Sequence, residues 1–453
     1  MQKNNLYDVI IVGGGPAGLS VGSELSKELK VLVVEKETAG ETDRSWFVPL
    51  DVANKNEDII KYTYGGVTRY LASTFSGANL SWDVKQFERY PFIKEKELLP
   101  YWVDVIRNNN SEIINNCFYQ NHSVENGIVT VSTSEGDFKA KLLIDASGHN
   151  SVVLKNYEME QDYYWWTIYG CTAKYKERPD NIKIGDYMLW QTFEDTNIDK
   201  NASLREGRPV FEYMVLDEET YLFFMLYLNK EKMPMDLAKE VFMHMLREEE
   251  TTKAFHGVEI IEPRFGYYPS GGLPERRAKD NVDFIGDAGC WTTPCGWGLA
   301  FILTNYKDYA DNIIKLIKED RLDENSLNDI VKLNVHQKHQ ILFDKLITHF
   351  LSNGSAEDLD KFINFFNMID PLICEKVFTL RVTHEEIEEL LKSFLQHFKL
   401  GELIKIIPKE DYLTVIREAK YLFEDLIFEK IFHHHSEDES GYDYYDEVID
   451  EIS

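Results

Sequence analysis

The sequence predicts an α/β fold with a βαβ unit at the N-terminus, an inserted β-rich region and a helical C-terminal region. Three observations predict it. A Gly-rich turn separates an apolar strand from a helix near the N-terminus, apolar and aromatic strand-forming runs fill residues 162–272, and apolar residues follow helical spacing beyond residue 323. A chain of 453 residues has room for two or three domains of ordinary size.

These patterns divide the chain into four parts. We expect residues 1–160 and 275–320 to form one discontinuous α/β domain, with a β-rich domain at 161–274 inserted between them. A helical domain at 321–435 follows. Residues 436–453 contain eight Asp or Glu and no Lys or Arg, which predicts a disordered acidic tail.

The charge balance excludes one class of partner. The chain has 49 Lys and Arg against 78 Asp and Glu, a formal net charge of −29. Nucleic acid is therefore not expected as a ligand, because binding a polyanion needs a basic surface that releases counterions. An anionic membrane surface is disfavoured for the same reason.

Cysteine usage and hydropathy indicate the compartment. Five cysteines are few for this length, and no secretory apolar segment precedes Asp8, which predicts a cytoplasmic protein with reduced thiols. The longest uncharged run, residues 288–306, is interrupted by Pro294, Asn305 and three glycines. We therefore expect no transmembrane helix.

The N-terminal unit carries the clearest chemical motif. An apolar strand at Tyr7–Val12 leads into GGGPAGLS, a helix follows from Pro16 to about Glu28, and a second strand at Val31–Val34 ends in Glu35. A GxGxxG pattern in this context binds a dinucleotide pyrophosphate at the helix N-terminus, and the acid after the second strand accepts hydrogen bonds from a ribose. The candidate cofactor residues here are Gly13, Gly15, Pro16, Ala17, Gly18, Glu35 and Lys36.

Two later segments identify the dinucleotide. KLLIDASGHNS and NVDFIGDAGCWTTPCGWGLAFI resemble the segments with which FAD-dependent oxidoreductases of the Rossmann type close over their cofactor. The resemblance implies FAD, with the second segment and the following helix start facing the flavin. It adds as cofactor candidates Asp145, Gly148, Gly286, Asp287, Pro294, Gly296 and Gly298, together with Arg44 and Arg89 at positions where related flavoproteins place an Arg near the cofactor.

The order of motifs resembles one family within this superfamily. GGGPAGL, IDASGHNS, WWTIYG, a hairpin near Tyr213–Leu228, YYPSGGLPE and GDAGCWTTPCGWG follow one another as in the lycopene cyclase family, over residues 5–320. Geranylgeranyl reductases and group A monooxygenases share the individual motifs. The resemblance implies a Rossmann-type FAD-binding domain with an inserted β-rich substrate domain and a C-terminal helical domain.

The acid of that family lacks a clear counterpart. Lycopene cyclases carry a Phe-Leu-Glu-Glu-Thr segment whose acids are thought to protonate the polyene. Alignment by strand position puts Phe224 and Met225 there, whereas alignment by letters selects DEET at 217–220, which has the character of a solvated turn. Without the acid, protonation loses its donor. The candidate catalytic residues are Glu218 and Glu219 from DEET, and Cys295 in the loop expected to face the flavin.

Aromatic residues predict the nature of the substrate. Trp and Tyr side chains recur in the segments expected around the flavin and suit a large hydrophobic or aromatic molecule. The candidate substrate-pocket residues are Trp165, Tyr169, Met225, Tyr268 and Trp297. No metal site is expected, because the His433–His435 run has no second cluster of ligands near it in the sequence.

The expected function is therefore an FAD-dependent oxidoreductase that reduces or oxygenates a hydrophobic small molecule. Its electrons would come from NAD(P)H bound transiently or from an external flavin reductase, since a second dinucleotide motif is missing. Three alternatives stay open: a non-redox lycopene cyclase-type enzyme using reduced FAD, a flavin-dependent halogenase, and a non-catalytic flavin-binding partner protein. The halogenase is disfavoured because WWTIYG is a poor match to the Trp-x-Trp-x-Ile-Pro signature.

Overall fold

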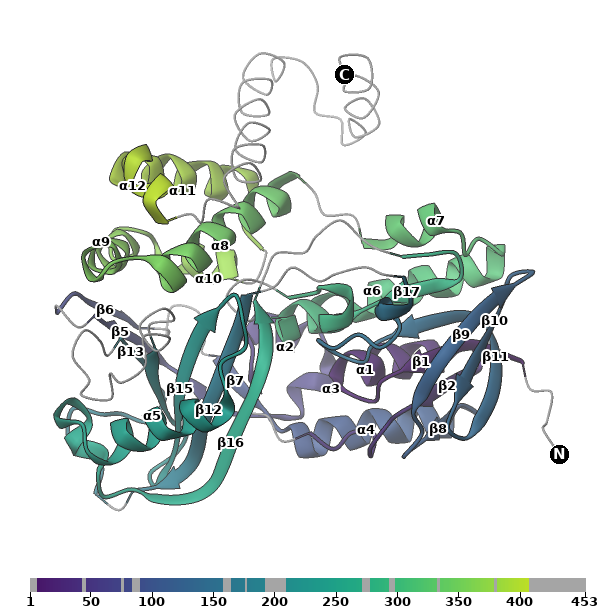
Figure 1. The fold of residues 1–453 in the computed structure, drawn as a ribbon, viewed down its shortest axis with the longest axis horizontal. Coiled ribbons are helices and arrows are strands. Elements are labelled where there is room, and N and C mark those ends of the chain that lie inside the picture. Colours follow the sequence, from purple (N-terminus) through teal and green to yellow (C-terminus); the bar gives the residue numbers. More distant parts are fainter. Residues whose placement is uncertain are drawn as a thin grey trace, which may run out of the picture. The chain divides into compact units, whose positions relative to one another are not determined.

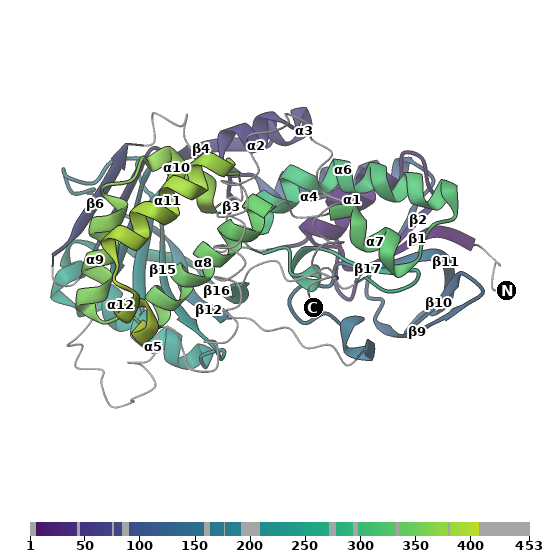
Figure 2. The same cartoon turned by 90° about the horizontal axis from the view of Figure 1, so that it is seen from above.

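Two large sheets and a set of C-terminal helices make up the computed structural model of the chain (Figures 1 and 2). The structure describes residues 6–42, 46–74, 77–83, 90–157, 164–175, 177–191, 209–270, 278–292, 298–331, 335–378 and 381–406. Residues 407–453, with the predicted acidic tail, lie outside the described residues.

The first sheet is built around the N-terminal βαβ unit. Its strand order is β8 (Glu112–Ile114), β2 (Val31–Val34), β1 (Leu6–Val12), β11 (Gly136–Asp145), β10 (Ile128–Thr133) and β9 (Tyr119–Glu125), with β17 (Val282–Phe284) pairing with β11. The pairs β8–β2, β2–β1, β1–β11 and β11–β17 are parallel. Because parallel strands end at one edge, the turns after β1, β11 and β17 meet there.

Both faces of this sheet are covered. Ile11 and Val33 pack toward α1 (Pro16–Leu25), α4 (Glu95–Asn108) and α6 (Gly298–Glu319), whereas Ile10 belongs to the core on the opposite face. Such burial on both faces explains why β1 and β2 are continuous apolar runs. Asn126 and Gly127 adopt positive φ and turn the chain between β9 and β10.

The second sheet contains the strands of the inserted region together with strands from an earlier part of the chain. Its order is β16 (Glu259–Ser270), β12 (Tyr164–Lys174), β15 (Thr220–Asn229), β14 (Val210–Val215), β13 (Asp186–Gln191), β5 (Arg69–Ser73) and β6 (Asn79–Asp83). The sequence assigned residues 69–83 to the nucleotide-binding region, but β5 pairs in parallel with β13 and so joins the second sheet. An ion pair between Arg69 and Asp186, at 2.5 Å, fixes this long-range pairing.

One face of the second sheet is closed by helix α5 (Met235–Arg247) (Figure 1). Val241, Phe242 and Met245 of α5 are buried against residues that alternate along the strands, among them Phe223 of β15. The 3-10 helix η4 (Glu250–Phe255) completes this core. The other face of the sheet points toward the first sheet and the C-terminal helices.

A small sheet connects the two large ones. It has the order β3 (Trp46–Phe47), β7 (Tyr90–Ile93) and β4 (Thr63–Val67), and the short helices α2 (Leu50–Asn54) and α3 (Glu57–Ile60) lie between β3 and β4 in the chain. Phe92 of β7 belongs to the same apolar core as Met214 and Leu222 of the second sheet. The small sheet therefore packs against the second sheet.

The C-terminal region is helical, with α7 (Glu324–Asn328), α8 (Val335–Asn353), α9 (Ala356–Phe366), α10 (Pro371–Phe378), α11 (His384–His397) and α12 (Leu400–Ile406). Figures 1 and 2 show α8 and α9 next to the second sheet. Two contacts attach α9 to β6: the Asn367 side chain, just after α9, donates to the Asn79 carbonyl at 2.7 Å, and the Phe366 and Trp82 rings lie 6.2 Å apart. Within the described ranges, no helix combines the length and apolar character needed to cross a bilayer.

Candidate functional site

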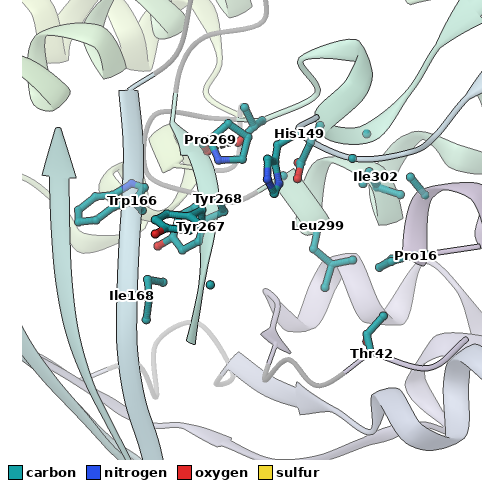
Figure 3. Close-up of a pocket in the computed structure, with 18 of the residues that line it drawn as sticks. Pro16, Thr42, His149, Trp166, Ile168, Tyr267, Tyr268, Pro269, Leu299 and Ile302 are labelled. Atoms are coloured by element: carbon teal, nitrogen blue, oxygen red, sulfur yellow. Dashed lines mark hydrogen bonds between the residues drawn. The ribbon is translucent and has the colours of Figure 1, made fainter. Parts of the chain in front are cut away.

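A cavity of about 1610 Å³ extends from the glycine turn of the first sheet to the open face of the second sheet. Pockets for a single small molecule have volumes of roughly 300–1,000 Å³, so this one has room for a dinucleotide and a second molecule. Figure 3 shows Trp166, Ile168 and Tyr268 of the second sheet on one side, and Pro16, Leu299 and Ile302 of helices α1 and α6 on the other.

The glycine turn has the geometry that the motif requires. Gly13 has a φ of +114°, and a Cβ there would lie 2.3 Å from the Ala146 carbonyl oxygen. A Cβ on Gly18 would lie 2.0 Å from the Gly13 carbonyl oxygen, so helix α1 approaches β1 as closely as glycine allows. A Cβ on Gly15 would meet nothing within 4 Å, which leaves space for a ligand at the helix start.

The three predicted cofactor segments meet at this turn. Ala146, after β11, contacts Gly13, and a Cβ on Gly286, after β17, would lie 2.8 Å from the Ala17 Cβ. Segments that are about 270 positions apart in the chain therefore touch. The cavity wall includes the predicted residues Gly13, Gly15, Pro16, Ala17, Glu35, Lys36, Gly148, Gly286, Asp287 and Gly298.

Glu35 reaches the glycine turn directly. Its carboxylate accepts the Gly14 amide at 2.6 Å and the Glu37 amide at 2.9 Å. These bonds fix the carboxylate at the cavity wall, and each oxygen has a further lone pair for a hydroxyl donor. The position agrees with the ribose-binding role expected of an acid at the end of β2.

Asp145 does not line the cavity, so its prediction as a cofactor contact is corrected. The residue is fully buried, and its carboxylate accepts the Ser151 hydroxyl at 2.7 Å and the Ser147 and Val153 amides at 2.9 and 3.2 Å. Burial outweighs these bonds and raises the pKa of Asp145. Its role is to hold the loop that carries Gly148 against the cavity. Gly18 likewise supports the turn rather than the cavity wall.

The residues of this end fit FAD. Helix α1 begins at Pro16, and its N-cap residue Gly15 provides no side-chain cap, so the first free amides of the helix point toward the open space beside Gly15. Free amides at a helix N-terminus bind a pyrophosphate. Asp287, in the 3-10 helix η5 (Gly286–Gly289) that follows β17, and Gly298, at the start of α6, line the same cavity further along.

The other end of the cavity is largely apolar. Alternate residues of β12 and β15 form its wall, and the C-terminal helices add a second wall. The apolar lining residues at this end are Leu80, Trp82, Trp166, Ile168, Leu189, Phe224, Leu226, Tyr268, Ile347, Leu351, Leu359, Phe362, Ile363 and Phe366. Helices α8 and α9, for which the sequence suggested no role, therefore help to enclose the cavity.

Three predicted pocket residues occupy the wrong face. Tyr169 and Met225 are buried in the core under α5, because neighbouring residues of a strand point to opposite faces. Trp165 has the same parity as Tyr169 and does not line the cavity: its ring packs on His149, 5.3 Å between centroids, and under the Lys232 ammonium at 4.0 Å. Tyr268 lines the cavity.

The predicted acids lie away from the cavity. Glu218 and Glu219 are exposed in the turn between β14 and β15, and Glu218 pairs with Arg178 at 3.1 Å. Asp217 shapes this turn by accepting the Glu219 and Thr220 amides at 2.9 and 2.8 Å. The interpretation as a solvated turn describes this geometry, and the proposal of Glu218 and Glu219 as catalytic acids is corrected.

Glu212 is the acid that sequence reasoning missed. It lies on β14, is 4% exposed, lines the cavity, and accepts the Tyr187 hydroxyl at 3.0 Å. Burial raises its pKa to about 8, although the bond from Tyr187 opposes the shift. The available signal was a lone acid inside the apolar strand FEYMV, where a charge is costly.

Some predictions fall outside the described residues, namely those for Arg44, Arg89, Pro294, Cys295, Gly296 and Trp297. Across the part of the chain that the structure describes, no group of three or more His, Cys, Asp or Glu residues could hold a metal ion.

Comparison with known proteins gives one family. The family described as "Lycopene cyclase protein" matches residues 8–401. No curated protein matches the chain.

Solved structures with similar folds share little sequence. A geranylgeranyl bacteriochlorophyll reductase-like protein from Thermoplasma acidophilum has a TM-score of 0.67 at 14% identity, covering 89% of this chain and 100% of that one. The halogenase PltM, solved with phloroglucinol and FAD, has a TM-score of 0.64 at 13% identity, covering 89% and 85%. A flavoprotein/dehydrogenase from Cytophaga hutchinsonii has a TM-score of 0.60 at 13% identity, covering 88% and 99%. These likenesses confirm the predicted fold class.

Proposed function

Because the chain belongs to the lycopene cyclase family, we propose that it is an FAD-dependent enzyme that acts on a hydrophobic small molecule. One observation carries the proposal: a single cavity joins the glycine turn at Gly13–Gly18 to the apolar wall formed by the second sheet and helices α8 and α9. A cofactor bound along the turn and a substrate against that wall would share one space.

Each end of the cofactor has residues that suit it. The Glu35 carboxylate would accept hydrogen bonds from the adenosine ribose, and the amides at the start of α1 would bind the pyrophosphate. Asp287 and the start of α6 at Gly298 would face the flavin half. When bound, FAD supplies electron-transfer and hydride chemistry.

The first candidate reaction is reduction or oxygenation of the substrate at the flavin. Its support is the largely apolar and aromatic wall, including Trp166 and Tyr268, whose rings lie 6.1 Å apart. Such a wall excludes water and orients a large apolar molecule. NAD(P)H or an external flavin reductase would deliver the electrons.

The second candidate reaction is a cyclisation or isomerisation that leaves the oxidation state unchanged. The family match favours it, and so does Glu212, an acid in the cavity wall at the end away from the glycine turn. Alignment by strand position gives no acid at Phe224 or Met225, which favours redox chemistry, whereas Glu212 supplies an acid from the neighbouring strand.

One experiment tests the function and separates the two reactions. Purified protein is saturated with FAD, and its absorption spectrum is followed anaerobically after NADH or NADPH is added. The flavin is then reduced with dithionite, lycopene is supplied in detergent, and the product is weighed by mass spectrometry. Bleaching of the flavin absorbance by NADH or NADPH, followed by reoxidation of the flavin by the substrate, supports redox chemistry. A product with the same mass as lycopene supports cyclisation. Failure to bind FAD contradicts both.

A further inference from the structure

Glu212 has no counterpart among the acids expected of this site. Among the described cavity-lining residues of the second sheet it is the one acid, and it points into a largely apolar space. Across β13 and β15 its register neighbours are Leu189 and Phe224. A carboxyl group in such surroundings is costly to the fold, so a role in the cavity would account for it.

The surroundings of Glu212 favour its neutral form. Tyr187 on β13 donates to Oε2, and the other titratable groups among the described residues that influence that hydroxyl are Tyr70 on β5 and Tyr268 on β16, which are uncharged at neutral pH. Among the residues that the structure describes, the cavity-lining cation of the sheet is Arg264 on β16, which pairs with Glu262 and lies three strands from β14, about 14 Å between the strands at ~4.8 Å per strand. The raised pKa of Glu212 agrees with this placement.

The position of Glu212 also matters. Glu212 lies directly opposite Phe224 on the neighbouring strand β15. Side chains in such a pair have Cβ atoms about 4.5–5.5 Å apart and share one face of the sheet. An acid at 212 therefore reaches nearly the same part of the cavity as an acid at 224.

We propose that Glu212 is the proton donor of this cavity and protonates a carbon–carbon double bond of an apolar substrate, an inference that rests on the second reaction of the proposed function. The O–H bond of Glu212 breaks, and the π electron pair of the double bond forms the new C–H bond. Tyr187 stabilises the carboxylate by donating to it. A neighbouring carbon of the resulting cation then loses a proton, which restores Glu212, so substrate and product have the same composition.

The first test uses lycopene as the probe, with dithionite-reduced FAD. The variant Glu212→Gln keeps the size of the side chain and removes the acid, so we expect about a 100-fold or greater loss of turnover with FAD affinity unchanged. Glu240→Gln, an exposed position on α5, is the matched control and should match the wild type. The double variant E212Q/F224E returns an acid to the opposite strand and should recover at least about tenfold. Turnover by E212Q within threefold of the wild type overturns the proposal.

The second test reads the proton itself and does not depend on the substrate. The infrared difference spectrum between wild type and E212Q reports the carbonyl band of a protonated carboxylic acid. We expect this band at pH 7, its loss near pH 8, and a higher midpoint in Tyr187→Phe, because the Tyr187 bond lowers the pKa of Glu212. A Glu212 already ionised at pH 7 overturns the proposal.

The two tests separate the possible failures. If the wild type binds FAD but leaves lycopene unchanged, the proposed cyclisation of lycopene is contradicted. The infrared result then decides separately whether Glu212 holds a proton in the cavity.

Discussion

The two faces of the second sheet differ although they share every strand. On the α5 face, Tyr169, Phe223 and Met225 interlock with the helix and are almost fully buried. On the cavity face, Ile168, Glu212, Phe224 and Leu226 border open space. Because side chains alternate along a strand, a shift of one residue changes a packing position into a site position. Stability and function can therefore be altered separately on the same strand.

The largest contrast is expected between adjacent phenylalanines. Phe223 is fully buried and packs on Phe255 and Tyr221, so Phe223→Ala should lower the free energy of unfolding by about 3–5 kcal/mol. Phe224 lies at the cavity, and Phe224→Ala should cost about 1 kcal/mol while changing substrate turnover. Denaturant unfolding of both variants measures this, and equal losses would contradict the assignment of faces.

The pH dependence of stability should reveal Glu212. Its pKa is raised in the folded state to about 8, above its unfolded value of about 4.3, so the folded state binds more protons between these pH values. The contribution of Glu212 to the free energy of unfolding is therefore fully present below pH 4. It falls by up to about 1.4 kcal/mol per pH unit as the pH rises toward 8. Between pH 5 and pH 7, the free energy of unfolding of the wild type should fall by about 3 kcal/mol relative to that of Glu212→Gln, because the Gln side chain does not titrate. A difference that does not vary with pH would show that Glu212 is not held neutral.

A smaller effect is expected at the glycine turn. Gly15→Ala meets no atom of the chain within 4 Å, so folding should be preserved, but the methyl group occupies the space beside the pyrophosphate site. FAD affinity should fall by about tenfold or more, measured by flavin fluorescence titration. Gly401→Ala, at an equally open glycine of α12, serves as the control. Unchanged FAD affinity in the Gly15 variant would argue against cofactor binding at this turn.

The smallest effect is expected at the acidic turn. Glu218→Gln and Glu219→Gln should change the free energy of unfolding by less than about 0.5 kcal/mol and leave turnover within twofold, because both side chains are exposed. Substrate turnover assays check this directly. A large loss of activity in either variant would contradict this and would identify Glu218 or Glu219 as the catalytic acid.

Local patterns were enough to predict which segments meet at the glycine turn. The βαβ unit, Glu35 and the turn at Asp287 after β17 each follow from a short motif, and parallel strands bring such turns together. The substrate end could not be predicted in this way. YLFFMLYL is apolar on both faces, so its pattern does not tell whether Phe224 or Met225 faces the cavity.

Long-range pairing was also invisible in the sequence. Strand β5 joins β13 across more than a hundred residues, and helices α8 and α9 reach the cavity from the end of the chain. The sequence contains Glu212 as a lone acid in an apolar strand. Its place in the cavity follows only from the register with Phe224 and from the alternation of side chains between the two faces. Comparison with the family's motif places the expected acid on β15, the strand next to the one that carries Glu212.

Equilibrium binding of FAD to the wild-type protein tests the central claim most directly. The account predicts a yellow complex of one FAD per chain, with flavin absorbance that shifts when the cofactor leaves water for the cavity. A folded protein that stays colourless and takes up no FAD at saturating concentration would contradict it.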